Sequence, residues 1–425
     1  MSGYGAARDS WQLQIHELRV DEFIRRYPRP ARVLFLLPGG MGSQLWRARA
    51  PGAGNAWVRL LPGAGYDFDR VWLDRKSFTG RALELRMAKN GDGAHHDLDD
   101  RIIIADGLVR VAGRTLYDRF SHWCTEQGLA LFTFAWDWRR RLEESADLFL
   151  RFLPFFRQRV GAAWGSDPLE GFVLLGHSYG GMIVRLLLDE ESPELDQMAR
   201  AITAACPFYG FGTILKRWLA GDPYLNLLGR RKVIGTICSL PGCYPLAYLD
   251  KDTWLENARS LVDDPFPLAA YPSLDGDGRP IDPYRPEPGQ YPENTGFDLA
   301  ELAHGSEIAR RIAAPPVRRA DKLICIRGVG YPTIGSITWK RQVSHHGRRS
   351  YPAMVFSQPG APGSPHYRLI SASPSPVPNT CSSANMALPS RRSPSCCDAP
   401  APQCRLVSGT YPLLSQMAPA HQPRG

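Results

Sequence analysis

The sequence has neither a long apolar run nor a recognisable leader. No apolar stretch approaches the roughly 20 residues that a membrane-spanning helix requires. The N-terminus, Met1 to Gly5, lacks the basic start and following apolar segment of a secretory signal. We therefore expect a soluble, cytoplasmic protein without a transmembrane segment, for which contact with a membrane surface would be transient.

The nine cysteines form no disulfide or metal-binding pattern. The chain has no C-x-x-C, and four of the cysteines lie near its C-terminus: Cys381, Cys396, Cys397 and Cys404. Buried free thiols in a reducing compartment are the favoured interpretation. His95 and His96 lie in a Gly/Asp-rich stretch, 90–100, without further ligands at short spacing. The sequence therefore predicts a solvated loop there, and neither a metal nor a cofactor is expected.

The positive charge is concentrated near the C-terminus. The formal net charge is +9, but residues 343–425 contain seven arginines, no lysine and one acid, Asp398. The preceding residues are close to neutral, which argues against a nucleic-acid-binding or anionic-membrane surface there. The same C-terminal stretch holds fourteen prolines and fourteen serines. Such a composition predicts disorder, and it also resembles a GC-rich gene translated in the wrong reading frame.

Short, unbroken apolar runs predict the strands of a parallel sheet. They alternate with helical segments, which implies an α/β fold with a doubly wound sheet. A polar lead helix is expected over 11–27, and a second helix over 142–160 with Pro154 inside it. The predicted strands are 33–37, 131–134, 172–175, 201–205 and 322–327.

Five segments follow from these patterns. Residues 211–320 lack strand–helix alternation and are predicted to be a mostly helical cap. The full division is a lead over 1–30, a core over 31–210, the cap over 211–320, a last core strand and loop over 321–341, and a disordered tail over 342–425.

Gly176-His177-Ser178-Tyr179-Gly180 is the most informative motif. It lies between the apolar run 172–175 and the apolar segment 182–188, which only Arg185 interrupts. A G-x-S-x-G turn between strand and helix holds its serine in a strained conformation, with the hydroxyl projecting from the sheet. Its glycines prevent clashes inside the turn. We predict that Ser178 is a nucleophile; the alternative is an ordinary Gly-rich turn.

A second Gly-rich loop, Pro38 to Leu45, follows the first predicted strand. Glycines let the backbone pass close to a ligand with its amides exposed. Beside a nucleophilic serine, such a loop would supply an amide of an oxyanion hole. A plain turn is the equally weighted alternative.

The acid and base that a nucleophilic serine requires are not evident. In the order typical of this motif, the acid follows a late strand and the histidine comes later still. After Ile326 the only acid is Asp398, while His304 and Asp321 precede the last strand. His345, followed by His346 and Gly347, is a candidate base by composition only.

Five motifs in sequence order resemble the lecithin:cholesterol acyltransferase family, which includes the lysosomal phospholipase and the phospholipid:diacylglycerol acyltransferases. The resemblance covers roughly residues 30–340. Its motifs are Pro38 to Leu45, Trp72-Leu73-Asp74, Trp136 to Arg139, Gly176 to Gly180, and Gly328 to Thr333.

The resemblance implies an α/β-hydrolase fold, with a mostly parallel sheet and a largely helical cap that admits a lipid acyl chain. It implies Ser178 as the nucleophile and the amides of Gly40 and Tyr179 as the oxyanion hole. It gives Asp137, Trp138 and Arg139 a supporting role.

The C-terminal side departs from the family pattern. The family's Gly-Asp-Gly-Thr-Val segment and later His-Gly are not found after the last strand, and Asp277 precedes that strand. The fold is therefore expected to be truncated on this side. Two hypotheses follow: a serine-dependent O-acyltransferase or phospholipase-lipase that acts on lipid esters through an acyl-enzyme, or a catalytically crippled relative, either a pseudoenzyme or a frameshifted product.

Overall fold

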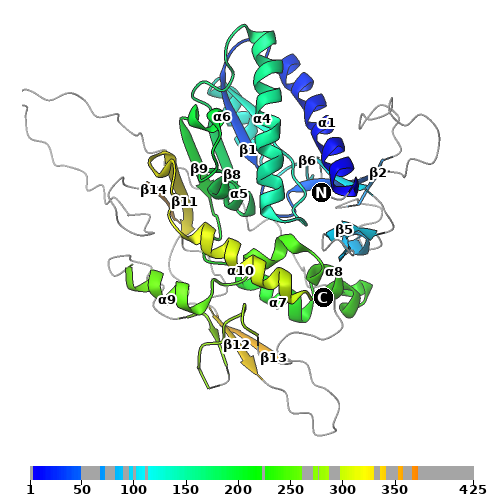
Figure 1. Ribbon diagram of the computed structural model, residues 1–425, viewed down its shortest axis with the longest axis vertical. Coiled ribbons are helices and arrows are strands. Elements are labelled where there is room, and N and C mark those ends of the chain that lie inside the picture. The colour runs from blue at the N-terminus through cyan, green and yellow to red at the C-terminus, as the bar shows by residue number, and fades with distance from the viewer. Residues whose placement is uncertain are drawn as a thin grey trace, which may run out of the picture. The chain divides into compact units, whose positions relative to one another are not determined.

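A six-stranded sheet forms the centre of the computed structural model (Figure 1). Its order is β14-β11-β9-β8-β1-β7, and neighbouring strands are parallel except for β14, which runs antiparallel to β11. The predicted α/β arrangement is confirmed. The bounds are β1 Arg32–Leu37, β7 Leu129–Thr133, β8 Val173–His177, β9 Arg200–Ala204, β11 Leu323–Val329 and β14 His366–Ser371.

The structure describes thirteen ranges, all within one unit, 1–384. The ranges are 3–48, 68–71, 82–89, 95–98, 102–110, 113–222, 225–260, 271–275, 277–286, 297–329, 336–340, 353–357 and 366–371.

None of the helices in these ranges is long and apolar enough to cross a bilayer.

Helices cover both faces of the sheet, which explains why its strands are apolar without alternation. Phe35 of β1 packs in the main core with residues of α1 (Gly3–Arg26), α4 (Leu142–Trp164) and α5 (Tyr179–Leu187). Leu34 and Leu36 face the other way and pack with Tyr117 and with Cys124 of α3 (Asp118–Glu126). Helix α1 begins well before the predicted Trp11, and α4 extends to Trp164, where Gly165 adopts a φ of 67°.

The described residues between β9 and β11 are mostly helical and form a second hydrophobic core, around Trp218, Tyr244 and Leu302. We call residues 212–313 the helical segment. Its elements are α7 Gly212–Ala220, η4 Asn226–Leu228, α8 Arg230–Cys238, η5 Pro241–Leu246, α9 Lys251–Ser260, β10 Ser273–Leu274 and α10 Leu299–Ala313.

Short elements complete the described chain. Strands β3, β2 and β6 form one small sheet, β10, β12 and β13 form another, and β4 pairs with β5 as a hairpin. Their bounds, with the remaining short helices, are β2 Ser43–Ala48, β3 Phe68–Arg70, η2 Ala82–Leu85, β4 Met87–Lys89, β5 His95–Asp97, β6 Ile102–Leu108, α6 Pro193–Asp196, η6 Ala320–Lys322, β12 Ser336–Lys340 and β13 Ala353–Ser357.

Two features differ from the sequence-based expectations. Strands β13 and β14 lie in the stretch that composition predicted to be disordered, because the backbone of β14 pairs with the edge of β11 whatever its side chains are. His95 and His96, expected in a solvated loop, belong to β5, where His96 is buried. Residues 72–74, 330–335 and 342–352, which include His345, lie outside the described ranges.

Candidate functional site

Ser178 lies at a strained turn between β8 and α5. Its φ is 51° and its ψ is −120°, a conformation that L-residues rarely adopt. The turn is held at both ends: the Ser178 N–H donates to the Ala204 carbonyl at 2.7 Å, and the Gly181 N–H donates to the Ser178 carbonyl at 3.0 Å. The strand, turn and helix therefore follow in the order that the G-x-S-x-G motif predicts.

The glycine-rich loop after β1 touches this turn. A Cβ atom placed on Gly39 would lie 3.1 Å from Ser178 Cβ, and one on Gly40 would lie 3.2 Å from Tyr179 Cδ1. The loop reverses at Met41, whose φ is 62°, and the Gly42 N–H closes the turn on the Gly39 carbonyl at 2.9 Å. Two segments far apart in sequence thus place Gly40 beside Tyr179, the pair predicted to supply the oxyanion hole.

Tyr117 connects the two segments. Its hydroxyl accepts the Gly39 N–H at 2.9 Å and lies 2.8 Å from Nδ1 of His177. Burial lowers the pKa of His177. The contact with Tyr117 fixes the His177 ring beside the turn. Sequence reasoning missed Tyr117, since no local motif marks it.

The Trp136–Arg139 run braces the same loop. The Trp136 indole N–H donates to the Pro38 carbonyl at 2.9 Å, and its backbone N–H donates to Ser43 Oγ at 3.1 Å. Its ring centroid lies 5.1 Å from that of Tyr179. Trp138 borders the cavity described below, so the run contacts both the loop and the space in front of Ser178.

A buried charge cluster lies next to this run. Arg139, 0% exposed, contacts Asp137 at 2.6 Å and Asp97 at 2.7 Å, and Arg140 contacts both carboxylates. Burial by itself would raise the pKa of Asp97, but the two guanidinium groups outweigh it and hold that pKa below its usual value. Asp137 and Arg139 do not line the cavity, but their neighbour Trp138 does, and Arg139 donates to the carbonyl of Leu85, another lining residue, at 3.3 Å. Asp97 and Arg140 were not anticipated.

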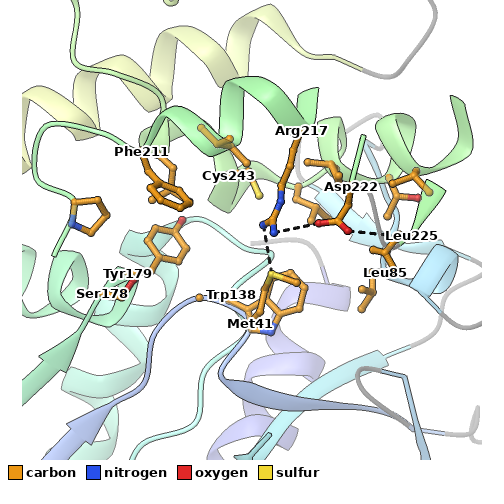
Figure 2. A pocket seen from close by; sticks show the side chains of 18 of the residues that line it. Met41, Leu85, Trp138, Ser178, Tyr179, Phe211, Arg217, Asp222, Leu225 and Cys243 are labelled. Atoms are coloured by element: carbon orange, nitrogen blue, oxygen red, sulfur yellow. Dashed lines mark hydrogen bonds and ion pairs between the residues drawn. The ribbon is translucent and has the colours of Figure 1, made fainter. Parts of the chain in front are cut away.

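A mostly apolar cavity of about 220 Å³ opens in front of Ser178 (Figure 2). Its charged members, Arg217 and Asp222, pair with each other at 3.1 Å, and burial raises the pKa of the Cys243 thiol to about 12. The cavity is lined by Gly40, Met41, Leu83, Leu85, Trp138, Ser178, Tyr179, Ala205, Pro207, Phe211, Ile214, Arg217, Asp222, Leu225, Val233, Thr236, Ile237, Leu240, Cys243 and Leu246.

Ser178 has no histidine beside it among the cavity-lining residues of the described ranges. His304 instead bonds to Glu143 at 2.5 Å, and neither residue lines the cavity. The candidate base His345 lies outside the described ranges. His366 opens β14 and is in register with Val329, so its backbone lies at the carboxyl end of β11.

Comparison with known proteins finds similarity to solved structures but not to sequences. The sequence matches no family model and no curated protein. It is similar to a chain in the crystal structure of the Tle4-Tli4 complex, at 13% identity and a TM-score of 0.43, over 78% of this chain and 85% of that chain. A similarity of this size does not bear on the role of Ser178, so the proposal below rests on the site itself.

Proposed function

We propose that the protein is a serine-dependent acyl-ester enzyme with an α/β-hydrolase fold, of the lecithin:cholesterol acyltransferase type. The observation that carries the proposal is the strained φ of 51° at Ser178, at the mouth of an apolar cavity. A strained residue persists only where the surrounding structure over-determines it, and such residues concentrate at functional sites. The resemblance of the five sequence motifs supports the same assignment.

In this proposal, Ser178 Oγ attacks the carbonyl carbon of an ester, and the C–O bond to the leaving alcohol breaks after a tetrahedral intermediate. The amides of Gly40 and Tyr179 would donate to the developing oxyanion; loss of one such donor typically costs about 100- to 1,000-fold in turnover. Tyr179 begins α5, so its N–H lacks an intrahelical acceptor. The apolar cavity would hold the acyl chain until water or an alcohol takes the acyl group.

The Ser178 proton must pass to a base, since a serine hydroxyl is a weak nucleophile without one. His345 is the candidate that composition offers. An alternative function follows from the cavity lining of the described ranges, which contains no histidine. A relative without the base would lose about a millionfold in turnover, and would act as a lipid-binding protein with the same cavity.

A fluorophosphonate probe separates the two functions. We expect the folded chain to be labelled at Ser178 faster than the denatured chain, and Ser178→Ala to remove the labelling. Ser192→Ala is the matched control, because Ser192 caps the short helix α6 away from the cavity. Labelling of the folded chain no faster than of the denatured chain would leave only the binding function.

The coding DNA tests the origin of the C-terminal stretch. If a frameshift follows codon 340, another reading frame should encode a Gly-Asp-Gly-Thr-Val-like segment and a later His-Gly. If neither alternative frame encodes them, the frameshift hypothesis is wrong.

A further inference from the structure

Three side chains of types that can ligate a metal meet where the β4–β5 hairpin contacts helix α10. They are His95 of β5, Asp298 at the N-cap of α10, and Glu301 in its first turn. One ligand atom of each lies within 4.8 Å of the others, and His95 Nδ1 is 3.7 Å from Glu301 Oε1. The imidazole and the Glu301 carboxylate are almost completely shielded from solvent, with side chains 7% and 1% exposed.

We propose that His95, Asp298 and Glu301 form a binding site for a divalent cation of the zinc class. One imidazole nitrogen and two carboxylate oxygens are the donor types that zinc accepts, and three protein ligands leave a fourth position for water. Such a site is independent of the proposed chemistry at Ser178. The histidine pair gave no hint of it, because the other two ligands come from a distant part of the chain.

The surroundings orient the two carboxylates. Asp298 accepts the N–H groups of Ala300 and Glu301 with Oδ1, at 2.8 and 3.2 Å, which turns Oδ2 toward the cluster. Arg141 contacts both oxygens of Glu301, and its Nε lies 3.1 Å from Oε2. Metal-bound carboxylates commonly keep an outer hydrogen-bond partner of this kind. Arg141 can therefore remain in place when an ion binds.

One cationic side chain already bonds to a carboxylate of the proposed site. Lys89 Nζ lies 2.8 Å from Asp298 Oδ2, and the lysine side chain is 37% exposed. Its ammonium group can therefore swing into solvent and leave its carboxylate to the metal. Lys89 and the ion would compete for one oxygen. Removal of the lysine charge should therefore strengthen metal binding, a result that a cluster held together only by ion pairs would not give.

The ion would connect the hairpin to the helical segment. The His95 carbonyl accepts from Arg140 at 3.2 Å, and Asp97 of the same strand pairs with Arg139. Binding would thus fasten α10 to the strand that supports the buried charges behind Trp138. We expect the ion to raise the thermal stability of the chain, because a ligand that binds only the folded state stabilises it.

The proposal is tested by titrating zinc into the chelator-treated full chain and measuring the heat of binding by calorimetry. Asp298→Asn keeps a capping oxygen for α10 but removes one charged ligand. We expect it to weaken one binding event by about 100-fold, since even an outer partner of a metal ligand can contribute that much. Lys89→Gln should strengthen the same event by up to about fivefold, the competition that an exposed ion pair can exert. His122→Gln, at a histidine side chain 78% exposed, is the control and should change nothing.

Cobalt spectra and melting curves complete the test. The cysteines near the C-terminus could bind zinc themselves, but cobalt at the proposed site should give a spectrum without thiolate charge-transfer bands. Zinc should raise the melting temperature of the parent chain and not of Asp298→Asn. The proposal is overturned if the parent and Asp298→Asn chains bind zinc equally and melt alike, or if Lys89→Gln weakens binding.

Discussion

Gly180 allows the turn at Ser178 and the loop after β1 to touch. A Cβ atom at this position would lie 2.3 Å from the Leu37 carbonyl oxygen and 2.5 Å from that of Pro38. Both neighbours are backbone atoms, which cannot move aside without shifting β1. The glycine is therefore required by the close approach of two chain segments, and not by its own dihedral angles.

At the residue scale, Gly180→Ala should destabilise the protein by about 3 kcal/mol, the upper range for inserting a methyl group into a packed core. It should also slow fluorophosphonate labelling, because the loop that carries Gly40 must move. Gly161→Ala is the matched control: its nearest contact would be an ordinary 3.4 Å, and alanine is favoured inside α4 by ~1 kcal/mol. Urea unfolding measures both variants. Equal stability of Gly180→Ala and the parent would show that the close approach is wrong.

At the scale of elements, Arg185 fastens α5 to the end of α10. It is 2% exposed, and its guanidinium donates to the carbonyls of Ala314 and Arg311 at 2.6 and 3.1 Å and to Asp189 at 2.8 Å. The last carbonyls of a helix have no intrahelical partner. The one charged residue in the apolar run after Ser178 thus satisfies the end of a helix far along the chain.

Arg185→Met keeps the aliphatic stem but removes these bonds. We expect a loss of about 3 kcal/mol in the free energy of unfolding, typical of breaking a buried ionic network. Arg159→Met is the control, because Arg159 pairs with Asp21 at 3.0 Å with its side chain 56% exposed. This substitution should lower the free energy of unfolding by less than ~1 kcal/mol. Chemical denaturation of both variants is the measurement, and equal losses would contradict the role of Arg185.

At the scale of the whole molecule, a buried histidine makes stability depend on pH. His16 belongs to α1 and is 1% exposed, and its ring stacks on Phe134 with centroids 4.2 Å apart. Burial lowers its pKa to about 3, and the charge of Arg19 contributes further. The unfolded chain has a histidine pKa near 6.5. Above that pH both states are neutral at His16, and below it only the unfolded chain gains the proton.

Stability should therefore fall as the pH drops from about 6.5 toward 3. The loss at pH 5 from this group is ~2 kcal/mol relative to pH 7. His16→Gln should remove that part of the pH dependence, whereas His122→Gln at the surface should retain it. The measurement is the free energy of unfolding in urea at pH 7 and pH 5. An unchanged difference between the two pH values in His16→Gln would show that His16 is not the responsible group.

The parallel strands and the turn at Ser178 can be predicted from neighbouring residues, because both depend on short-range rules. A strand buried on both faces needs an unbroken apolar run, as in 33–37, and a serine turn between strand and helix needs glycines at fixed spacing. Both requirements concern residues that are close together in the sequence, so a short stretch is enough to predict them.

Contacts between groups that are far apart in the sequence could not be predicted, because they form only when the chain folds. Tyr117 bridges Gly39 and His177, and Asp97 completes the charge cluster. Asp298 lies beside His95 although the two residues are far apart in the sequence. Composition likewise gave no sign of β14, which pairs through backbone atoms that every sequence possesses. These contacts depend on the path of the whole chain, which no local sequence pattern predicts.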